Sequence, residues 1–430
     1  MTESDKIKQE IYNNVAKFLK LQKKQDVFIP KQRKISYCEP IYDEKELNAA
    51  IDVLLSGWLP EGKNTEQFEK EWSNYNNIPE TVLVNSGSSA LLLALSTLKN
   101  KFIKNHLNEG DEVITSALTF STNLSSIVLN NLTSVFVDVD ENYNLNPDLI
   151  ENMISEKTKA ILVTHHLGNP AQMNKIMEIA KKHNLFVIED CCGAHGAIYN
   201  GKKVGTIGDL GCFSFHGAHA IFMGEGGAIT MKDASFAPTI RSLKTCGVYD
   251  IRNQNKDPAW EEELSKLPDY DERTVTMNPG YKLRVLDLQP AIGLQQLPRL
   301  DQFIKKRQEN VNFYNENLKK YEKFLTLPKA TNNSSPSWFS YPITIKKYTP
   351  FKREALIKHL NEHNIETRPL LGGNLIKHPA FLNIKHRSSE LPNTEFFSKN
   401  SFYIGCWPGL TREMRDFVVS TFDSFLQKYL

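Results

Sequence analysis

The sequence has few cysteines, and none of them stands at a metal-binding spacing. It contains six in 430 residues, scattered and without a Cys-x-x-Cys pair: Cys38, Cys191, Cys192, Cys212, Cys246 and Cys406. Structural zinc sites and disulfide frameworks both require clustered cysteines. We therefore predict no metal centre and no disulfides, and interpret the six residues as buried free thiols.

The chain also lacks a long apolar segment and an excess of charge of one sign. No apolar run reaches the roughly 20 residues that span a bilayer. The N-terminal segment MTESDKIKQE has no signal-peptide core. The 52 basic and 50 acidic residues give a net charge of +2. This balance argues against nucleic-acid or membrane partners, and we expect a cytoplasmic protein.

Short apolar segments alternate with helical ones from about residue 80 to residue 230. We expect strands at 82–85, 112–115, 135–140, 160–165 and 185–188. This alternation favours an α/β fold with a mostly parallel sheet and helices on both faces. The later segment 232–275 is polar, and we interpret it as irregular.

The length of the chain favours more than one domain, because 430 residues exceed a typical single core. We predict an N-terminal helical extension and linker over 1–40 and a large domain over 41–290. A smaller α+β domain is expected over 291–430.

Polar and small residues follow two of the expected strands. Asp190 comes just after the apolar run 185–188, at the strand end where parallel sheets bind ligands. Ser86-Gly87-Ser88-Ser89 joins a strand to a helical run, and the free N–H groups of such a turn bind phosphate. Many strand–helix turns carry glycine and serine, however, and an aspartate here can also be a helix N-cap.

The segment from Gly211 to Gly227 is expected to form a strand, a loop and the start of a second strand. The loop carries Ser214, His216 and His219 before a glycine-rich turn. Loops held by a rigid sheet often carry chemistry. Histidine exchanges protons near neutral pH, so His219 is a candidate acid–base group.

Together these motifs resemble the DegT/DnrJ/EryC1/StrS sugar aminotransferase family, over roughly residues 40–425. The family pattern Ser-Phe-x-x-x-Lys, followed by Gly-x-Gly-Gly, is matched at Ser214 and Phe215, with His219 in the lysine position. The resemblance implies the fold of the fold-type I pyridoxal phosphate (PLP) enzymes. That fold has a large domain with a mostly parallel seven-stranded sheet and a smaller C-terminal domain.

The resemblance also implies which residues hold the cofactor. Gly87, Ser88 and Ser89 match the phosphate-binding turn, and Ser214 would add a hydroxyl. The resemblance implies two further cofactor contacts, from Phe120 and from Asp190. Phe120 would stack on the pyridine ring, and Asp190 would pair with the ring nitrogen and so make the ring an electron sink.

Three further residues are implied at the edge of the site. Lys282 stands where the family has an asparagine that reaches the phosphate of the neighbouring subunit, which implies a homodimer with shared sites. Trp58, in a Gly-Trp-Leu entry loop, and Arg368 are candidates for substrate binding. A packed tryptophan and a solvated lysine remain the simpler alternatives for Trp58 and Lys282.

The histidine at position 219 decides which reaction is expected. An imidazole cannot bind PLP covalently as a lysine amine does. The same exchange occurs in a branch of the family, the nucleotide-sugar 3-dehydratases. The resemblance therefore implies non-covalent PLP, converted to pyridoxamine phosphate (PMP) by glutamate, and a nucleotide-activated 4-keto-6-deoxy sugar as substrate. His219 would take a proton from the cofactor C4′ carbon and protonate the departing C3 hydroxyl, giving a 3-deoxy sugar and ammonia.

Other features leave alternatives open. Gly193 replaces a family side chain that contacts the cofactor's phenolic oxygen, and Ala194-His195-Gly196 follows the aminotransferase pattern. Cys246 is alone in 232–275, whereas a [2Fe–2S] cluster needs about four thiolates, so we predict none. The alternatives are a sugar aminotransferase, a cluster-dependent dehydrase and a catalytically silent relative in which His219 is an ordinary loop residue. The roles of His216 and His195 stay open.

Overall fold

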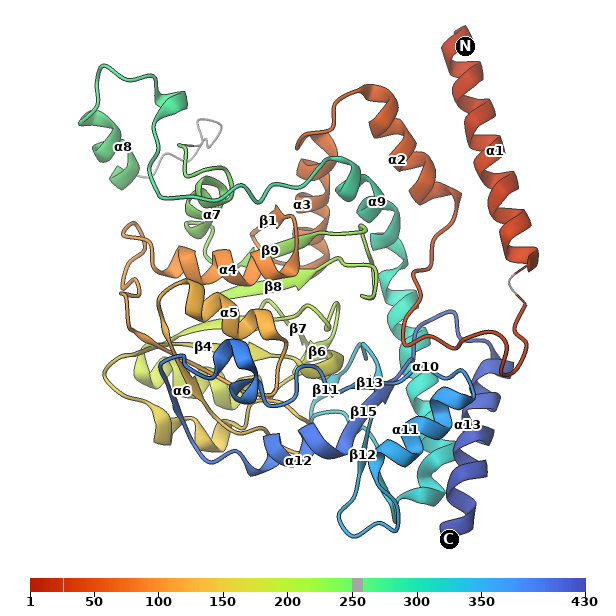
Figure 1. The fold of residues 1–430 in the computed structure, drawn as a ribbon. Helices are drawn as coiled ribbons and strands as arrows, with labels where there is room; N and C mark the ends of the chain where they lie inside the picture. Colours follow the sequence, from red (N-terminus) through yellow and green to blue (C-terminus); the bar gives the residue numbers. More distant parts are fainter. Residues whose placement is uncertain (26, 250–257) are drawn as a thin grey trace.

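A wide sheet and a smaller sheet lie side by side in the molecule, each with its own helices (Figure 1). The computed structural model describes residues 1–25, 27–249 and 258–430. The strands of the wide sheet are β1 (Glu80–Val84), β2 (Glu112–Thr115), β3 (Thr133–Phe136), β4 (Thr158–Thr164), β5 (Phe186–Asp190), β8 (Leu210–Ser214), β9 (Gly227–Met231) and β14 (His386–Ser388).

The wide sheet has the order β1-β9-β8-β5-β4-β2-β3-β14. All of its pairs are parallel except those that β9 makes with β1 and β8. The predicted mostly parallel α/β sheet is therefore confirmed. The eighth strand, β14, was not expected, because its three residues His386-Arg387-Ser388 carry no apolar pattern and lie within the predicted C-terminal domain.

The strands bury side chains on both faces of this sheet. In β1, Leu83 points into one core cluster and its neighbours Val82 and Val84 into another. Alternate residues of a strand point to opposite faces, so a continuous apolar run is what two covered faces require.

Different helices cover the two faces. Helices α3 (Lys63–Asn76) and α6 (Met173–His183) contribute to the Leu83 cluster. Helices α4 (Gly87–Leu98) and α7 (Phe236–Lys244) contribute to the other, and α5 (Ser121–Leu129) packs beside α4.

The interpretation of residues 232–275 as irregular is wrong for the part that the structure describes. This part contains α7 and the helix α8 (Pro258–Ser265), drawn in green in Figure 1. Phe236, Ile240 and Leu243 follow helical spacing and are buried, so a narrow apolar stripe suffices to fold α7 onto the sheet. Residues 250–257 lie outside the described residues.

The smaller part is built on the antiparallel sheet β10-β12-β15-β13. Its strands are β10 (Leu325–Thr326), β12 (Tyr341–Ile345), β13 (Arg368–Pro369) and β15 (Ser401–Ile404). Its helices are α10 (Leu300–Leu318), α11 (Arg353–Glu362), α12 (Pro392–Asn400) and α13 (Arg412–Leu426). The last helix, α13, is capped by Thr411, whose side chain accepts a hydrogen bond from the Met414 N–H at 3.2 Å.

The first 40 residues contact both parts of the molecule. Helix α1 (Glu3–Gln25) stands at one side and is held to α2 (Glu44–Ser56) by Asp52, whose carboxylate pairs with Lys8 at 2.5 Å. Ile35 bridges to Ile365 and is buried in the core of the smaller part. The boundaries at residues 40 and 290 stay predictions.

Three short strands form a further small sheet in the order β11-β6-β7. They are β6 (Ile198–Tyr199), β7 (Lys202–Lys203) and β11 (Ser334–Ser335). Within the described ranges, no helix combines the length and the apolar character needed to cross a bilayer. All six cysteines are free; Cys191, Cys212 and Cys406 are buried, but Cys246 is exposed, contrary to our expectation of buried thiols.

Candidate active site

Three segments from different strands meet at Gly87. A Cβ atom at Gly87 would lie 2.5 Å from the Ser214 Cβ and 2.8 Å from the Cys192 Sγ. Gly87 begins α4 after β1, Ser214 ends β8, and Cys192 follows Asp190 at the end of β5. The structure therefore brings the predicted phosphate turn, the predicted serine and the predicted aspartate to one edge of the wide sheet.

The turn before α4 has backbone donors to offer. Ser86 caps the helix by accepting a hydrogen bond from the Ser89 N–H at 3.1 Å, and the Ser89 hydroxyl donates to the Asn85 side chain at 2.7 Å. Ser89 is thus engaged within the turn. The N–H groups of Gly87 and Ser88 stand in the first turn, where the helix supplies no acceptor, so they are the donors open to an anion.

Asp190 is buried and firmly oriented. One carboxylate oxygen accepts a hydrogen bond from the Asn123 side chain at 2.9 Å, and the other accepts the Cys192 N–H at 3.0 Å. Asn123 is itself fixed, since it also donates to Thr119 and Thr164. A carboxylate held this way can face a cationic ring nitrogen without reorganising.

The loop after β8 carries the two histidines in different surroundings. His216 is exposed, and its Nε2 lies 3.9 Å from a carboxylate oxygen of Glu225. The backbone N–H of His219 donates a hydrogen bond to the His216 carbonyl at 3.0 Å, which forms a tight turn. The imidazole of His219 is half-buried between His195, at 5.7 Å between ring centroids, and Phe339, at 5.4 Å.

The surroundings of His219 keep its imidazole neutral. Burial lowers the pKa of His219 well below its usual range, and the nearby His195, His216 and Arg307 lower it further. Nδ1 of His219 is buried without a hydrogen-bond partner in the described part of the chain. At neutral pH His219 is therefore a neutral imidazole with a free lone pair, the form that a general base requires.

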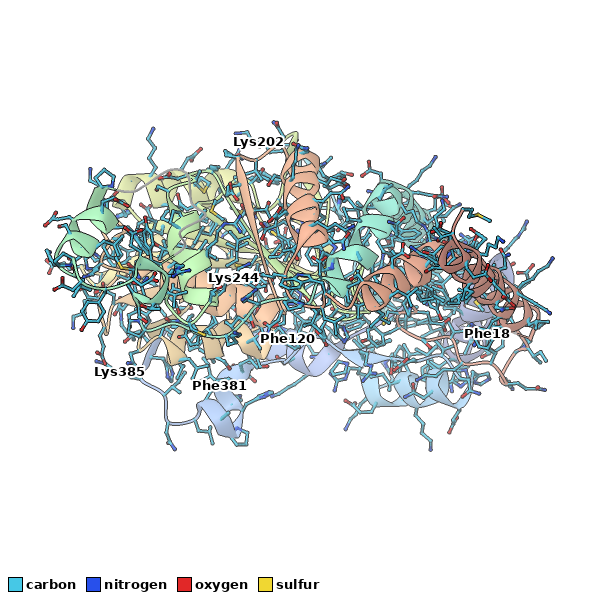
Figure 2. All side chains as sticks on the ribbon, turned by 90° about the horizontal axis from the view of Figure 1, so that it is seen from above. Phe18, Phe120, Lys202, Lys244, Phe381 and Lys385 are labelled. Carbon is cyan, nitrogen blue, oxygen red and sulfur yellow. The ribbon has the colours of Figure 1, made fainter. Side chains whose placement is uncertain are left out.

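Phe120 stands at the start of α5 with 53% of its surface exposed. Figure 2 labels it near the middle of the molecule, away from Phe18 on α1. Among the described residues its ring stacks on no other aromatic ring. An exposed ring beside the Thr119–Asn123–Asp190 chain of hydrogen bonds is free to stack on a flat ligand.

Arg368 belongs to the smaller part and is linked to His219 through two aromatic rings. Its guanidinium pairs with Glu366 at 2.8 Å and lies 4.8 Å from the centroid of the Tyr37 ring. Tyr37 in turn packs near Phe339, which contacts His219. Arg368 is therefore half-exposed on the side of the site where Phe339 lies.

The structure does not join the other two edge candidates to His219 within one chain. Trp58 is 62% exposed and lines a separate cavity of about 590 Å³ between α2, α3 and α9 (Leu288–Gln296). Lys282 is exposed, and it makes no ion pair with any residue that the structure describes. Within the described part of one chain, neither side chain forms a hydrogen bond or ion pair with Asp190 or His219.

Three side chains near the site were not assigned by sequence. Asn123 holds Asp190, and Phe339 packs over Gly193, with its Cβ 3.5 Å from a Cβ built there. Arg307 is buried, and its guanidinium donates to the Phe339 carbonyl at 2.7 Å and to the Trp338 carbonyl at 3.2 Å. The sequence does mark Arg307 as unusual, because it lies among the apolar residues on the buried face of the charged helix α10.

A second buried cluster is explained by hydrogen bonds alone. His165, Glu189 and Cys191 have potential ligand atoms within 4.8 Å of one another. His165 Nδ1 accepts the Ala171 N–H at 3.0 Å, so its proton is on Nε2, which lies 2.9 Å from Glu189. Neither ring nitrogen has a lone pair left for a metal.

The residues at the sheet edge fit a phosphorylated pyridine cofactor. Open N–H groups at a helix N-terminus suit a phosphate, and an oriented carboxylate suits a protonated ring nitrogen. Any side chain at Gly87 would fill the space beside Ser214. The only fully buried lysine ammonium near this edge in the described chain, that of Lys244, is bonded to Glu61 at 2.6 Å and to the Leu83 carbonyl at 2.9 Å.

Comparisons with known proteins agree with this arrangement. Residues 40–423 match the model of the DegT/DnrJ/EryC1/StrS aminotransferase family. The lipopolysaccharide biosynthesis protein RfbH of Salmonella typhimurium is 41% identical, over 89% of each chain. The dTDP-4-dehydro-2,6-dideoxy-D-glucose 3-dehydratase of Saccharopolyspora spinosa is 39% identical, over 90% of this chain and 86% of its own.

A solved structure extends the comparison to the fold and the cofactor. It is GDP-4-keto-6-deoxymannose-3-dehydratase with a trapped PLP–glutamate geminal diamine. Its TM-score is 0.80 at 27% identity, covering 90% of this chain and 99% of that one. The fold-type I architecture and the dependence on PLP are thereby confirmed.

Proposed function

The chain belongs to the DegT/DnrJ/EryC1/StrS aminotransferase family, whose members are PLP-dependent, and from that premise we propose that it is a 3-dehydratase. Its substrate would be a nucleotide-activated 4-keto-6-deoxy sugar and its product a 3-deoxy sugar. Glutamate would supply the amino group that converts PLP to PMP. No iron–sulfur cluster takes part in this proposal.

The observation that carries the proposal is the type of residue on the loop that follows Ser214. On the loop that follows Ser214 stands a neutral histidine, His219, in the position where the family has a lysine. Lys244 is a buried lysine that could in principle form a Schiff base, but its ammonium is paired with the Glu61 carboxylate. A site with an acid–base group and no Schiff-base lysine favours proton transfer and release of the cofactor amine over completed transamination.

Different residues of the chain are proposed to hold different parts of the cofactor. We assign the phosphate to the N–H groups of Gly87 and Ser88 and to the Ser214 hydroxyl, the ring face to Phe120 and the ring nitrogen to Asp190. When bound, the cofactor supplies an amine for the sugar ketone and an electron sink. His219 Nε2 takes the proton released at the cofactor and returns it to the departing C3 hydroxyl, which leaves as water.

The remaining contacts come from the edge of the site. We assign Arg368 to an anionic group of the nucleotide sugar, since its guanidinium is half-exposed beside Tyr37. Trp58 and Lys282 are proposed to act in a homodimer, because neither joins the site within one chain. Lys282 of one subunit would then face the phosphate held by the other.

Nitrogen tracing separates this proposal from its rivals. Purified protein is incubated with PLP, ¹⁵N-glutamate and 4-keto-6-deoxy sugars bearing GDP, dTDP or CDP. We expect PLP to convert to PMP without a borohydride-trapped protein adduct, a sugar that has lost one oxygen atom, and ¹⁵N in free ammonia. A sugar that retains ¹⁵N would establish an aminotransferase instead.

Two further outcomes would also overturn the proposal. Product formation that requires stoichiometric bound iron would establish a cluster-dependent dehydrase. Cofactor binding without any turnover of glutamate would establish a silent relative.

A further inference from the structure

The ring of Phe339, from the smaller part of the molecule, packs against His219. The two ring centroids are 5.4 Å apart and the rings are inclined by 47°, a usual geometry for an aromatic pair. Phe339 comes just before β12, whereas His219 belongs to the loop after β8. The side chain proposed as the acid–base group is therefore contacted by a residue from a distant part of the chain.

The orientation of the His219 ring depends on contacts of this kind. Its Nδ1 is buried without a hydrogen-bond partner among the described residues. The loop that carries it is loosely surrounded two residues earlier, where a Cβ at Gly217 would meet no atom within 4 Å. Packing against neighbouring rings therefore contributes more than hydrogen bonding at Nδ1 to holding the imidazole.

Phe339 is itself fixed through its backbone. Its N–H donates to the Leu167 carbonyl at 2.8 Å, and its carbonyl accepts a hydrogen bond from the buried Arg307 at 2.7 Å. Arg307 also donates to the Trp338 carbonyl at 3.2 Å. Trp338 has a φ of +47°, which a residue of its size rarely adopts. Backbone in such a conformation persists where its surroundings fix it, and these hydrogen bonds do so here.

Two glycines leave room for this turn. Gly168 has a φ of +83°, and a Cβ there would lie 2.7 Å from the backbone nitrogen of Trp338 and 2.8 Å from that of Phe339. A Cβ at Gly193 would lie 3.5 Å from the Phe339 Cβ and 3.8 Å from its Cγ, which is ordinary contact. A methyl group therefore fits at position 193, but a longer side chain would compete with the Phe339 ring for space.

The Phe339 ring covers His219 without adding charge. Both residues are partly buried. Burial is the main cause of the lowered pKa of His219, and the neighbouring groups His195, His216 and Arg307 lower it further. A hydrocarbon ring on one side of the imidazole excludes water and so favours its neutral form.

We infer that Phe339 is a positioning residue, whose ring holds the His219 imidazole in place and shields it from water in the space that a long side chain at position 193 would need. The inference rests on the proposed function only for the task of His219. The contact itself is a property of the protein without substrate.

The test follows the ionisation of His219 in the protein without substrate. Protein with ¹³C-labelled histidine rings is titrated by NMR spectroscopy, and the His219 signal is assigned by its loss in His219→Asn. We expect the pKa of His219 to rise by about one unit or more in Phe339→Ala, because water then reaches the imidazole. Phe339→Leu keeps the apolar bulk and should retain most of the native pKa.

Position 193 offers a second route that leaves Phe339 in the chain. We expect Gly193→Gln to displace the ring and raise the pKa of His219, whereas Gly193→Ala should titrate as the native protein does. The double variant Gly193→Gln with Phe339→Ala should show no further rise beyond Phe339→Ala, because both changes remove the same contact. Near-UV circular dichroism verifies folding, and Gly193→Gln remains as the test if Phe339→Ala does not fold.

The outcomes separate this inference from the proposed function. Titration of His219 that is the same in the native protein and in every folded variant would overturn the inference. So would a native His219 that titrates near 6.5. We also expect Phe339→Ala to lower kcat of dehydration about 10- to 100-fold with little change in KM, because the base is displaced while the substrate contacts remain. A raised pKa with an unchanged kcat would support the contact and refute His219 as the base.

Discussion

Gly87 and Ser214 approach so closely that a methyl group at position 87 would lie 2.5 Å from the Ser214 Cβ. This contact joins the start of α4 to the end of β8, and it leaves backbone rather than side chains at the anion-binding turn.

We expect Gly87→Ala to weaken PLP binding by about tenfold or more and to reduce the free energy of unfolding by about 1–3 kcal/mol, since the turn must move away from Ser214. Fluorescence titration with PLP and urea unfolding measure the two effects. Gly217→Ala is the control, because a Cβ there meets no atom within 4 Å. Equal PLP affinity in Gly87→Ala and the native protein would exclude this turn from the cofactor site.

His219→Asn is expected to retain PLP binding and to lose dehydration by about 10²- to 10⁴-fold, because the acid–base group is removed. Release of ¹⁵N-ammonia from labelled glutamate measures the loss. His216→Asn is the matched variant three residues away, and its exposed ring predicts a smaller effect. If the two variants lose activity equally, His219 is not the sole proton carrier.

Stability is expected to fall as the solution is acidified below pH 6.5. Burial lowers the pKa of His195 to about 3 in the folded protein, from the usual 6.5 of an exposed histidine. Between these values the unfolded chain binds a proton that the folded protein does not, so acid favours unfolding, whereas above pH 6.5 both states are neutral. For His195 alone this difference corresponds to about 2 kcal/mol between pH 7 and pH 5.

Urea unfolding at pH 7 and pH 5 measures the contribution of His195 to the pH dependence of the free energy of unfolding. His195→Phe should lose less stability on acidification than the native protein. An equal loss in both proteins would mean that His195 is not a buried neutral group.

Mixed dimers test whether sites are shared. His219→Asn and Lys282→Ala each damage every site of their own homodimer under the proposal. A mixed dimer has one site with His219 from one chain and Lys282 from the other, so random 1:1 reassembly should restore about a quarter of native activity. Analytical ultracentrifugation verifies the dimer. A mixture no more active than the average of its parents would place Lys282 outside the partner's site.

The sequence predicted best those features that are local in the chain. The buried strands are short apolar runs, and Asp190 and Gly87 stand directly at strand ends, where the parallel topology brings them together. His219 was found because one loop carries an ordered set of residue types. Each of these signals spans only a few neighbouring residues.

Features that depend on distant contacts were missed or left open. The pocket of His195 is formed by Trp72 from α3 and by Phe213 and Phe215 from β8, and no local pattern connects them. Asn123 contacts Asp190 across 67 positions. Helix α7 was missed because its polar composition concealed a single buried stripe.

The pairing of β14 with β3 has a consequence for the synthesis of the chain. Strand β3 lies beside β2 on one side, and its other side is completed by residues 386–388, near the C-terminus. Until that segment has left the ribosome, the nascent wide sheet has an open edge of unpaired N–H and C=O groups, which invites pairing with other chains. A chain that ends before residue 386 would therefore expose the edge of β3 to pairing with other chains. Every residue proposed for the cofactor site would nevertheless be present in that chain.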